Sequence, residues 1–169
     1  MQRSAIARLL WCGLGAAVGG AVAFVPCFAA CLAVLASPGG SAVFLFGLTR
    51  APAAQPRALF GGHPGGALIG IACYQLFGDS LWVYALAQVL ALWYMLLTRT
   101  VHPPAGANPM IMIHAHSQSD CALGAGFHWS VPLGYRGSCW SRLYPGLSHY
   151  PVSWLDQSPP SLFWGGWNE

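Results

Sequence analysis

Three polar side chains stand close together in a very apolar chain, in the segment TRTVHPPAGANPMIMI at residues 98–113. Arg99 carries a fixed charge, His102 titrates near physiological pH, and Asn108 can both donate and accept hydrogen bonds. These groups predict a site in which Arg99 attracts a small anion and His102 either donates a hydrogen bond to it or carries a co-transported proton. The alternatives are that Arg99 lies at the membrane edge with its head in water, His102 caps a turn and Asn108 holds the loop together.

The prolines and the glycine of this segment predict an interrupted helix. Pro103 and Pro104 cannot continue a preceding helix, and Gly106 follows in the same short stretch. Backbone N–H groups after Pro104 are then available to complete the shell around an anion.

A second interruption is predicted earlier, where Pro38-Gly39-Gly40-Ser41-Ala42 resembles the order of residues 104–108. Paired Gly/Pro-broken segments are typical of transporters built from repeats, whose half-helix N-termini point at bound anions. We therefore expect Gly39, Gly40 and Ser41 to form a second half-site, near the middle of a span that begins after Pro26. The alternative is a chance match in a chain with 21 glycines and 13 prolines.

The composition is that of a membrane protein, since 56% of the residues are hydrophobic and 7% are charged against about 25% in soluble domains. Uncharged stretches cover residues 9–49, 58–78 and 80–98. Because a bilayer span needs about 20 apolar residues, the first stretch can hold two spans and the others one each. An all-α, polytopic helical bundle of about four spans is predicted.

The charges of residues 1–113 fit this count. The arginines fall at positions 3, 8, 50, 57 and 99, and the one acid is Asp79. With both ends inside, all five arginines lie on the cytoplasmic face, as the positive-inside rule requires. Scattered arginines without topological meaning are the alternative. With no paired carboxylates, phosphate loop or nucleophile and base, we expect no enzyme, no catalytic residue and no cofactor.

Two features of the first residues bear on processing and location. The basic, apolar start and the CFAAC at residues 27–31 loosely resemble a lipoprotein signal, but later stretches would still need a membrane. The absence of an Arg- and Ser-rich leader favours a bacterial inner membrane. The six cysteines show no CxxC spacing and predict neither a disulfide framework nor a metal site.

The motif HPPAGANP at residues 102–109 resembles the motif that names the HPP family of integral membrane proteins. LLTRT (96–100), AQPRALFGGH (54–63) and YQLFGDSLW (74–82) add to the resemblance, which runs over about residues 13–113. It implies a small helical membrane protein of four or five spans, generally regarded as a transporter, with plant plastid members linked to nitrite. A membrane-embedded sensory or structural module without transport is the alternative, in which the breaks serve tight helix packing.

The resemblance carries the motif residues onto 102–109, with Arg99 upstream, His63 in GGH and the second-span block at 38–42. We expect His63 and Gln75 to be weaker site candidates, Gln75 bonding between helices. One departure is GGHPGG, whose glycines would weaken the helix that begins there.

The larger departure follows Ile113, where family members continue into another apolar span. Residues 114–169 contain no uncharged stretch of 18 residues and are rich in Ser, Trp, Pro, His and Gly. We expect residues 1–113 to form the transmembrane domain and the tail to be irregular, disordered or translated from a shifted reading frame, in which case the protein lacks its last span.

The tail and the composition also set expectations about ligands and partners. His114, His116, Cys121 and His128 lack the paired spacing of a zinc site, so we expect no metal. The expected partners are membrane lipid and a small anion and not nucleic acid, while a homo-oligomer remains open.

Overall fold

The computed structural model describes residues 2–24, 36–116, 130–144 and 146–158. Within them the chain forms helices and one isolated β-bridge between Thr100 and Ser158. The predicted all-α fold is confirmed. The predicted turn near Pro26 lies outside the described residues.

Four long or joined helices lie in the first two thirds of the chain. They are α1 (Gln2–Phe24), α2 (Ala36–Ala42) continued by the π-helical turn η2 (Val43–Gly47), α3 (Pro56–Phe77) and α4 (Leu81–Thr98). Short 3-10 helices, η3 (Pro52–Ala54) and η4 (Pro103–Ala107), precede α3 and α5 (Asn108–His114). The described part ends with α7 (Ser130–Leu143) and an extended segment.

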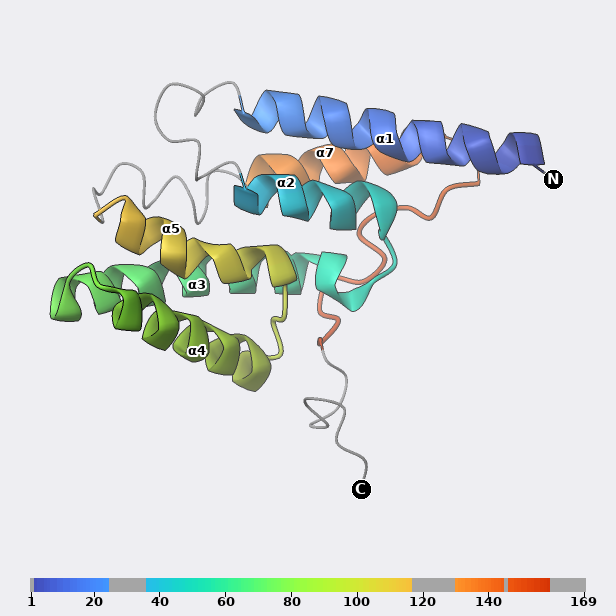
Figure 1. Cartoon of the computed structure of the whole chain (residues 1–169). Coiled ribbons are helices and arrows are strands. Elements are labelled where there is room, and N and C mark those ends of the chain that lie inside the picture. The colour runs from blue at the N-terminus through green and yellow to red at the C-terminus, as the bar shows by residue number, and fades with distance from the viewer. Residues whose placement is uncertain (1, 25–35, 117–129, 145, 159–169) are drawn as a thin grey trace.

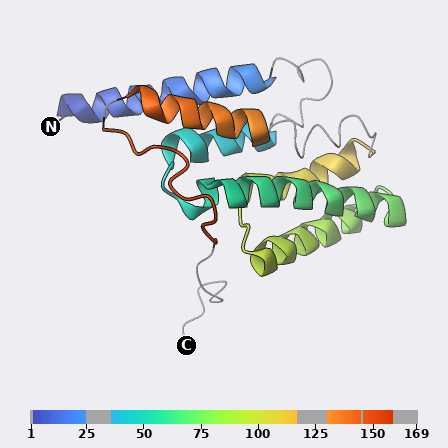
Figure 2. The same cartoon turned by 180° about the vertical axis from the view of Figure 1, so that it is seen from behind.

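The helices form two groups that meet where α2 contacts η4 and where α3 contacts α7 (Figure 1). One group holds α1, α2 and α7, and the other holds α3, α4 and α5, as the view from behind also shows (Figure 2). Leu45, Leu59, Leu133 and Tyr150 are in the core of the first group and its contact with α3. A second core, around Val83 and Ile113, joins α3, α4 and α5.

The helix α4 has the properties of a membrane span. Among the described residues, Leu81–Thr98 is the one helix that is both long and apolar enough to cross a bilayer. Val83, Ala87 and Ala91 are spaced by four residues along α4, and their small side chains are buried. Leu81 and Leu97 on its other side are exposed.

The predicted break at Pro38-Gly39-Gly40 is wrong in its detail. These residues are α-helical and belong to the first described turns of α2. A proline in the first turn of a helix leaves no hydrogen bond unmade, so the helix continues. The irregular turn comes later, at Val43–Gly47, where Leu48 N–H lies 3.2 Å from Val43 O. The second interruption is observed, since α4 ends at Thr98 and α5 begins at Asn108.

The glycines of α3 do not interrupt that helix. It is continuous from Pro56 to Phe77, with Pro64 inside it. Gly62, Gly66 and Gly70 recur every four residues and face the motif segment, so that added Cβ atoms would lie 3.1 Å from His102 Cβ, 2.9 Å from Ala105 O and 2.6 Å from Pro109 O, respectively. We call these three residues the glycine row. Their cost in helix propensity is offset by the close approach that they allow.

The predicted irregular tail is also corrected in part, because residues 130–143 form the helix α7. Gly134 and Gly137 let this helix approach Leu59, Phe60 and Leu45 closely. No strong apolar period marks it, so its helical state depends on this packing, which sequence patterns do not report. Residues 117–129 and 159–169 lie outside the described residues, and the reading-frame hypothesis stays a prediction.

Gln55, which is fully buried, forms hydrogen bonds with both the loop before α3 and the segment after α7. Its Nε2 donates to Thr49 O at 2.9 Å and Ala51 O at 3.1 Å, and its Oε1 accepts from the backbone N–H groups of Val152 and Ser153 at 3.0 and 3.1 Å. Part of the tail is therefore docked on the helical domain.

The glycine row makes a stability prediction. Gly70→Ala places a methyl group against the backbone of Pro109, and we expect it to destabilise the fold by about 1–3 kcal/mol through overpacking. Thermal unfolding in detergent measures this. The control is Gly13→Ala in α1, whose Cβ meets nothing within 4 Å and which gains up to about 1 kcal/mol of helix propensity. Equal effects of the two substitutions would contradict the close packing.

Candidate polar core site

Five polar side chains meet in the protein interior at the contact between the two helix groups. They come from α2 (Ser37 and Ser41), α3 (His63), the turn before η4 (His102) and the start of α5 (Asn108). Each is at most 2% exposed. We call this set the polar core.

Ser37 and Ser41 are four residues apart and therefore share one face of α2. The Ser41 hydroxyl lies 3.0 Å from His63 Nε2, 2.8 Å from His102 Nε2 and 3.0 Å from Ser37 O. Ser41 is thus the centre of the polar core, since both imidazole rings contact the same oxygen.

The Nδ1 atoms of the two imidazole rings have different partners. His102 Nδ1 donates to Ala53 O in η3 at 2.6 Å. His63 Nδ1 lies 3.0 Å from Asn108 Nδ2 and 3.2 Å from the Ser37 hydroxyl. The rings are 4.9 Å apart between centroids. A continuous line of hydrogen-bonding atoms therefore runs from Asn108 to Ala53.

The motif segment is held to α2 and α3 by the same groups. Asn108 Nδ2 donates to the backbone oxygen of His63 at 2.9 Å, and Ser37 donates to Pro104 O at 3.1 Å. The Pro104 ring lies against Gly40, where an added Cβ would be 3.0 Å away. The two Pro/Gly segments predicted as half-sites thus lie in contact.

The structure places the other predicted residues around this centre. Within the motif, Gly106 is buried and Pro103 is exposed, while Gly39 of α2 is half-buried. Asn108 holds the segment in place, which is the role preferred from the sequence, but its Oδ1 is buried and has no hydrogen-bond partner among the described residues. A buried oxygen of this kind is uncommon and can accept from a bound solute.

Arg99 does not join the polar core: its side chain lies toward the surface, as in the alternative given for it in the sequence analysis, and its attraction of an anion stays a prediction. It ends α4 in the left-handed conformation (φ 55°), and its guanidinium donates to Gln157 Oε1 at the exposed surface. The backbone N–H of Arg99 closes the helix on Leu96 O at 3.2 Å, and its side chain reaches Gln157 instead of His102.

Two members of the polar core were undervalued by sequence reasoning. His63 was ranked low and Ser37 was not selected at all, although both are central to the hydrogen bonds. The signal for His63 was its position as an ionisable residue inside an uncharged stretch of 21 residues, 58–78. Ser37 had a weaker signal, its spacing of four residues from Ser41. Gln75 is exposed on α3.

The tail histidines have other surroundings. His116 Nε2 lies 2.9 Å from Asp79 Oδ2, and its ring stacks on Tyr74. His114 is exposed. Among the described residues, no group of three or more His, Cys, Asp or Glu side chains has the arrangement of a metal site. Cys121 and His128 lie outside the described residues.

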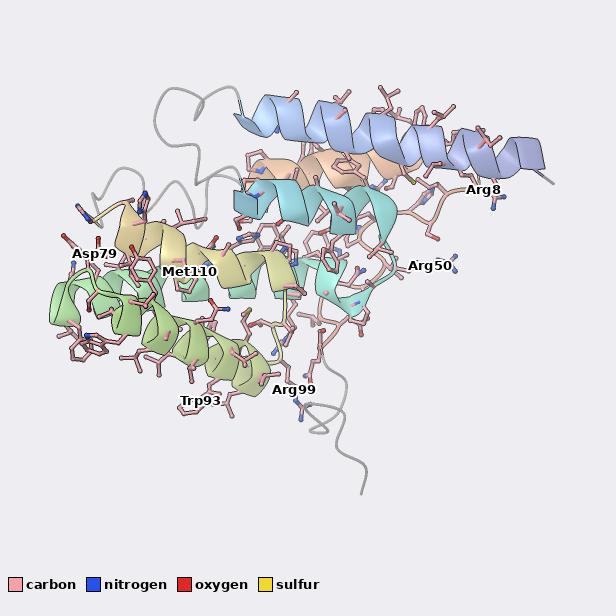
Figure 3. All side chains as sticks on the ribbon, in the orientation of Figure 1. Arg8, Arg50, Asp79, Trp93, Arg99 and Met110 are labelled. Atoms are coloured by element: carbon pink, nitrogen blue, oxygen red, sulfur yellow. The ribbon has the colours of Figure 1, made fainter. Side chains whose placement is uncertain are left out.

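The charged side chains Arg8, Arg50, Arg99 and Asp79 lie toward opposite ends of the molecule (Figure 3). Arg8, Arg50 and Arg99 are toward one end, and Asp79 is at the opposite end. Arg57 belongs to the first end, since it donates to Thr98 O at 2.9 Å. The sidedness of these residues relative to a membrane stays a prediction.

A cavity of about 340 Å³ opens at the arginine end. Arg50 and Ser148 line it together with the backbone of the turn after η2, and Arg50 Nε donates to the Ser148 hydroxyl at 2.5 Å. Ala51 lines the same cavity, two residues before the carbonyl that accepts from His102. The cavity thus adjoins the loop that holds one end of the polar core.

Comparison with known proteins supports the resemblance found in the sequence. A family model described as "HPP, transmembrane region" matches residues 1–135, past Ile113. Two transmembrane proteins of Dictyostelium discoideum are 36% identical over 89 residues and 32% identical over 100 residues, covering 50% and 57% of this chain. The matches cover 29% and 32% of those relatives, so the chain spans about a third of their length. No solved structure matches.

The central position of Ser41 predicts a large effect of its removal. Ser41→Ala leaves both His63 Nε2 and His102 Nε2 without their shared partner, and we expect a loss of about 1–3 kcal/mol for each buried group left unpaired. Unfolding in detergent measures this. Ser153→Ala is the control, because Ser153 contacts Gln55 through its backbone N–H. A Ser41→Ala protein as stable as the control would show that the hydroxyl does not hold the rings.

Proposed function

The chain belongs to the HPP transmembrane family, and we propose that this membrane protein is a transporter or channel for a small inorganic anion, with the polar core as its binding site. The observation that carries the proposal is the meeting of Ser41, His63 and His102 in the interior of an apolar helical protein. Polar and ionisable groups at such positions are unfavourable in a membrane and usually mark substrate pathways.

The chemistry of the polar core fits a small anion. Serine hydroxyls, imidazole N–H groups and the Asn108 amide supply hydrogen-bond donors, and none of them carries a permanent charge. These donors now bond to one another, so an anion binds by taking the place of contacts such as that of Ser41 with His63. Nitrite is one small anion, and its connection with this chain comes through the family alone.

The described conformation is closed around the site, because His102 is fully buried and His63 is 2% exposed. Passage of an ion therefore requires movement at the contact of the two helix groups, as in other transporters that alternate access around a fixed site. The π-helical turn at Val43–Gly47 lies directly after Ser41 on the same helix. Such turns are frequent at functional sites, and this one is the natural place for α2 to adjust.

The Arg50 cavity suits the mouth of such a pathway. An exposed cation at a concave opening raises the local concentration of anions by attraction. Arg50 lines that cavity, whereas Arg99 bonds to Gln157 away from it. Arg50, rather than Arg99, is therefore the arginine that we expect to attract the ion.

A second candidate function is a sensory or structural module without transport. The observation that favours it is the nearly complete hydrogen bonding of the polar core, which also suits a group that fixes helix packing. In that case the polar core binds no anion and serves only to hold the helices together.

Transport is tested in liposomes that contain the purified full chain, with uptake of nitrite, nitrate and chloride measured by ion-selective electrodes. We expect saturable uptake of at least one anion, and a fall of about tenfold or more in His102→Ala because a hydrogen-bonding group at the site is lost. His149→Ala, at an exposed position after α7, is the matched control. No uptake of any of the three anions above that of protein-free liposomes would favour the structural module.

The role of the cavity is tested by comparing Arg50→Gln with Arg99→Gln. We expect Arg50→Gln to slow uptake several-fold at low ionic strength, with the difference shrinking near 1 M salt, where the screening length is about 3 Å. Arg99→Gln should stay within about twofold of the unchanged protein, since Arg99 bonds to Gln157 and does not line the cavity. A larger effect at Arg99 than at Arg50 would place the mouth elsewhere.

A further inference from the structure

The carbonyl of Ala53 determines which atoms of the polar core donate hydrogen bonds and which accept them. A carbonyl oxygen only accepts, so His102 Nδ1, 2.6 Å away, must carry a hydrogen in every state that keeps this contact. A neutral His102 then has a bare Nε2, which accepts from the Ser41 hydroxyl at 2.8 Å. Since Ser41 has one hydrogen, its contact with His63 at 3.0 Å must be a donation from His63 Nε2. His63 Nδ1 is then bare and accepts from Asn108 Nδ2 at 3.0 Å.

The same positions also accommodate one more proton. The Ser41 hydroxyl lies within 3.0 Å of Ser37 O, so rotation about its C–O bond can direct the hydrogen to that carbonyl instead. The Ser41 oxygen then accepts from both Nε2 atoms, and His102, holding hydrogens on Nδ1 and Nε2, is an imidazolium ion. Every ring hydrogen has an acceptor in this arrangement, and no heavy atom needs to move.

The surroundings hold no other positive charge for an anion to pair with. Among the described residues, the groups around His102 are Phe44 of η2 with ring centroids 5.7 Å apart, Ser41 of α2, His63 of α3 and the Ala53 carbonyl of η3. His63 is the only titratable one of these. Arg57 is engaged with Thr98 O. A bare anion in this interior would therefore be uncompensated, which is strongly unfavourable.

We infer that the polar core binds the anion together with a proton, which His102 holds while Ser41 changes the acceptor of its hydroxyl from His102 to Ser37. This inference rests on the proposed function and adds the coupling ion to it. The step is the transfer of a proton from hydronium to His102 Nε2, in which one O–H bond breaks, one N–H bond forms and a water molecule is left. The anion and the proton then leave together, and the neutral arrangement returns.

Coupling is tested in liposomes loaded with a pH-sensitive dye, with the membrane potential held at zero by valinomycin and equal potassium on both sides. An inward gradient of nitrate, whose strong conjugate acid does not itself carry protons through lipid, or of chloride should acidify the lumen as the anion enters. Uptake should rise as the outer pH falls. His102→Gln should lose the acidification, and His149→Gln should keep it. Uptake of an anion down its gradient without acidification of the lumen would overturn the coupling and leave the proposed function standing.

The hydrogen-bond arrangement has a test that does not need transport. Nitrogen NMR of 15N-histidine protein in detergent micelles, assigned with single His→Gln variants, distinguishes which ring nitrogens carry hydrogen. We expect neutral His102 with hydrogen on Nδ1, neutral His63 with hydrogen on Nε2, and conversion of His102 to imidazolium on acidification before His63. In Ser41→Ala this order should be lost, and Ser41→Thr, which keeps a hydroxyl, should restore it. Neutral His102 with hydrogen on Nε2 alone would overturn the inference, whatever the uptake assay gives.

Discussion

The glycine row of α3 is the constraint on which the site depends. Without side chains at Gly62, Gly66 and Gly70, the backbone of residues 102–109 lies directly on the helix surface. Because of that contact, His102 and His63 lie close enough for both rings to contact the hydroxyl of Ser41. A methyl group on any of the three would meet backbone or Cβ atoms, which cannot move aside as the end of a flexible side chain can. Close packing of backbone, rather than a large apolar core, therefore fixes the site.

The polar core combines two roles that are often separated. Asn108 and Ser37 each donate to a backbone oxygen of another segment, and so they hold the motif to α2 and α3. Ser41 and the two imidazoles carry the hydrogens that can be rearranged. Buried polar networks specify a unique arrangement when every member is satisfied. The side chains that bond to the backbone of other segments thus position the side chains whose hydrogens can be rearranged.

Charge is arranged at a distance from this centre. Arg8, Arg50 and Arg99 lie toward one end of the molecule (Figure 3), and the polar core itself contains side chains that are neutral or gain charge by protonation. This division avoids the high free energy of a permanent ion inside an apolar protein. It also means that attraction of an ion at the surface and its binding inside involve different residues.

The sequence by itself determined the helical class, the membrane composition, the family motif and the presence of His102, Ser41 and Asn108 near two Pro/Gly segments. These follow from local properties, namely the length of apolar stretches, the missing N–H of proline and the sparse charges. Only the tertiary structure decided that Arg99 turns outward, that His63 and Ser37 join the site, that Pro38 continues a helix and that residues 130–143 form α7. The reason is that each of these depends on which surfaces meet across 22 to 98 residues of chain, and the spacing of residues along one segment carries no information about its partner.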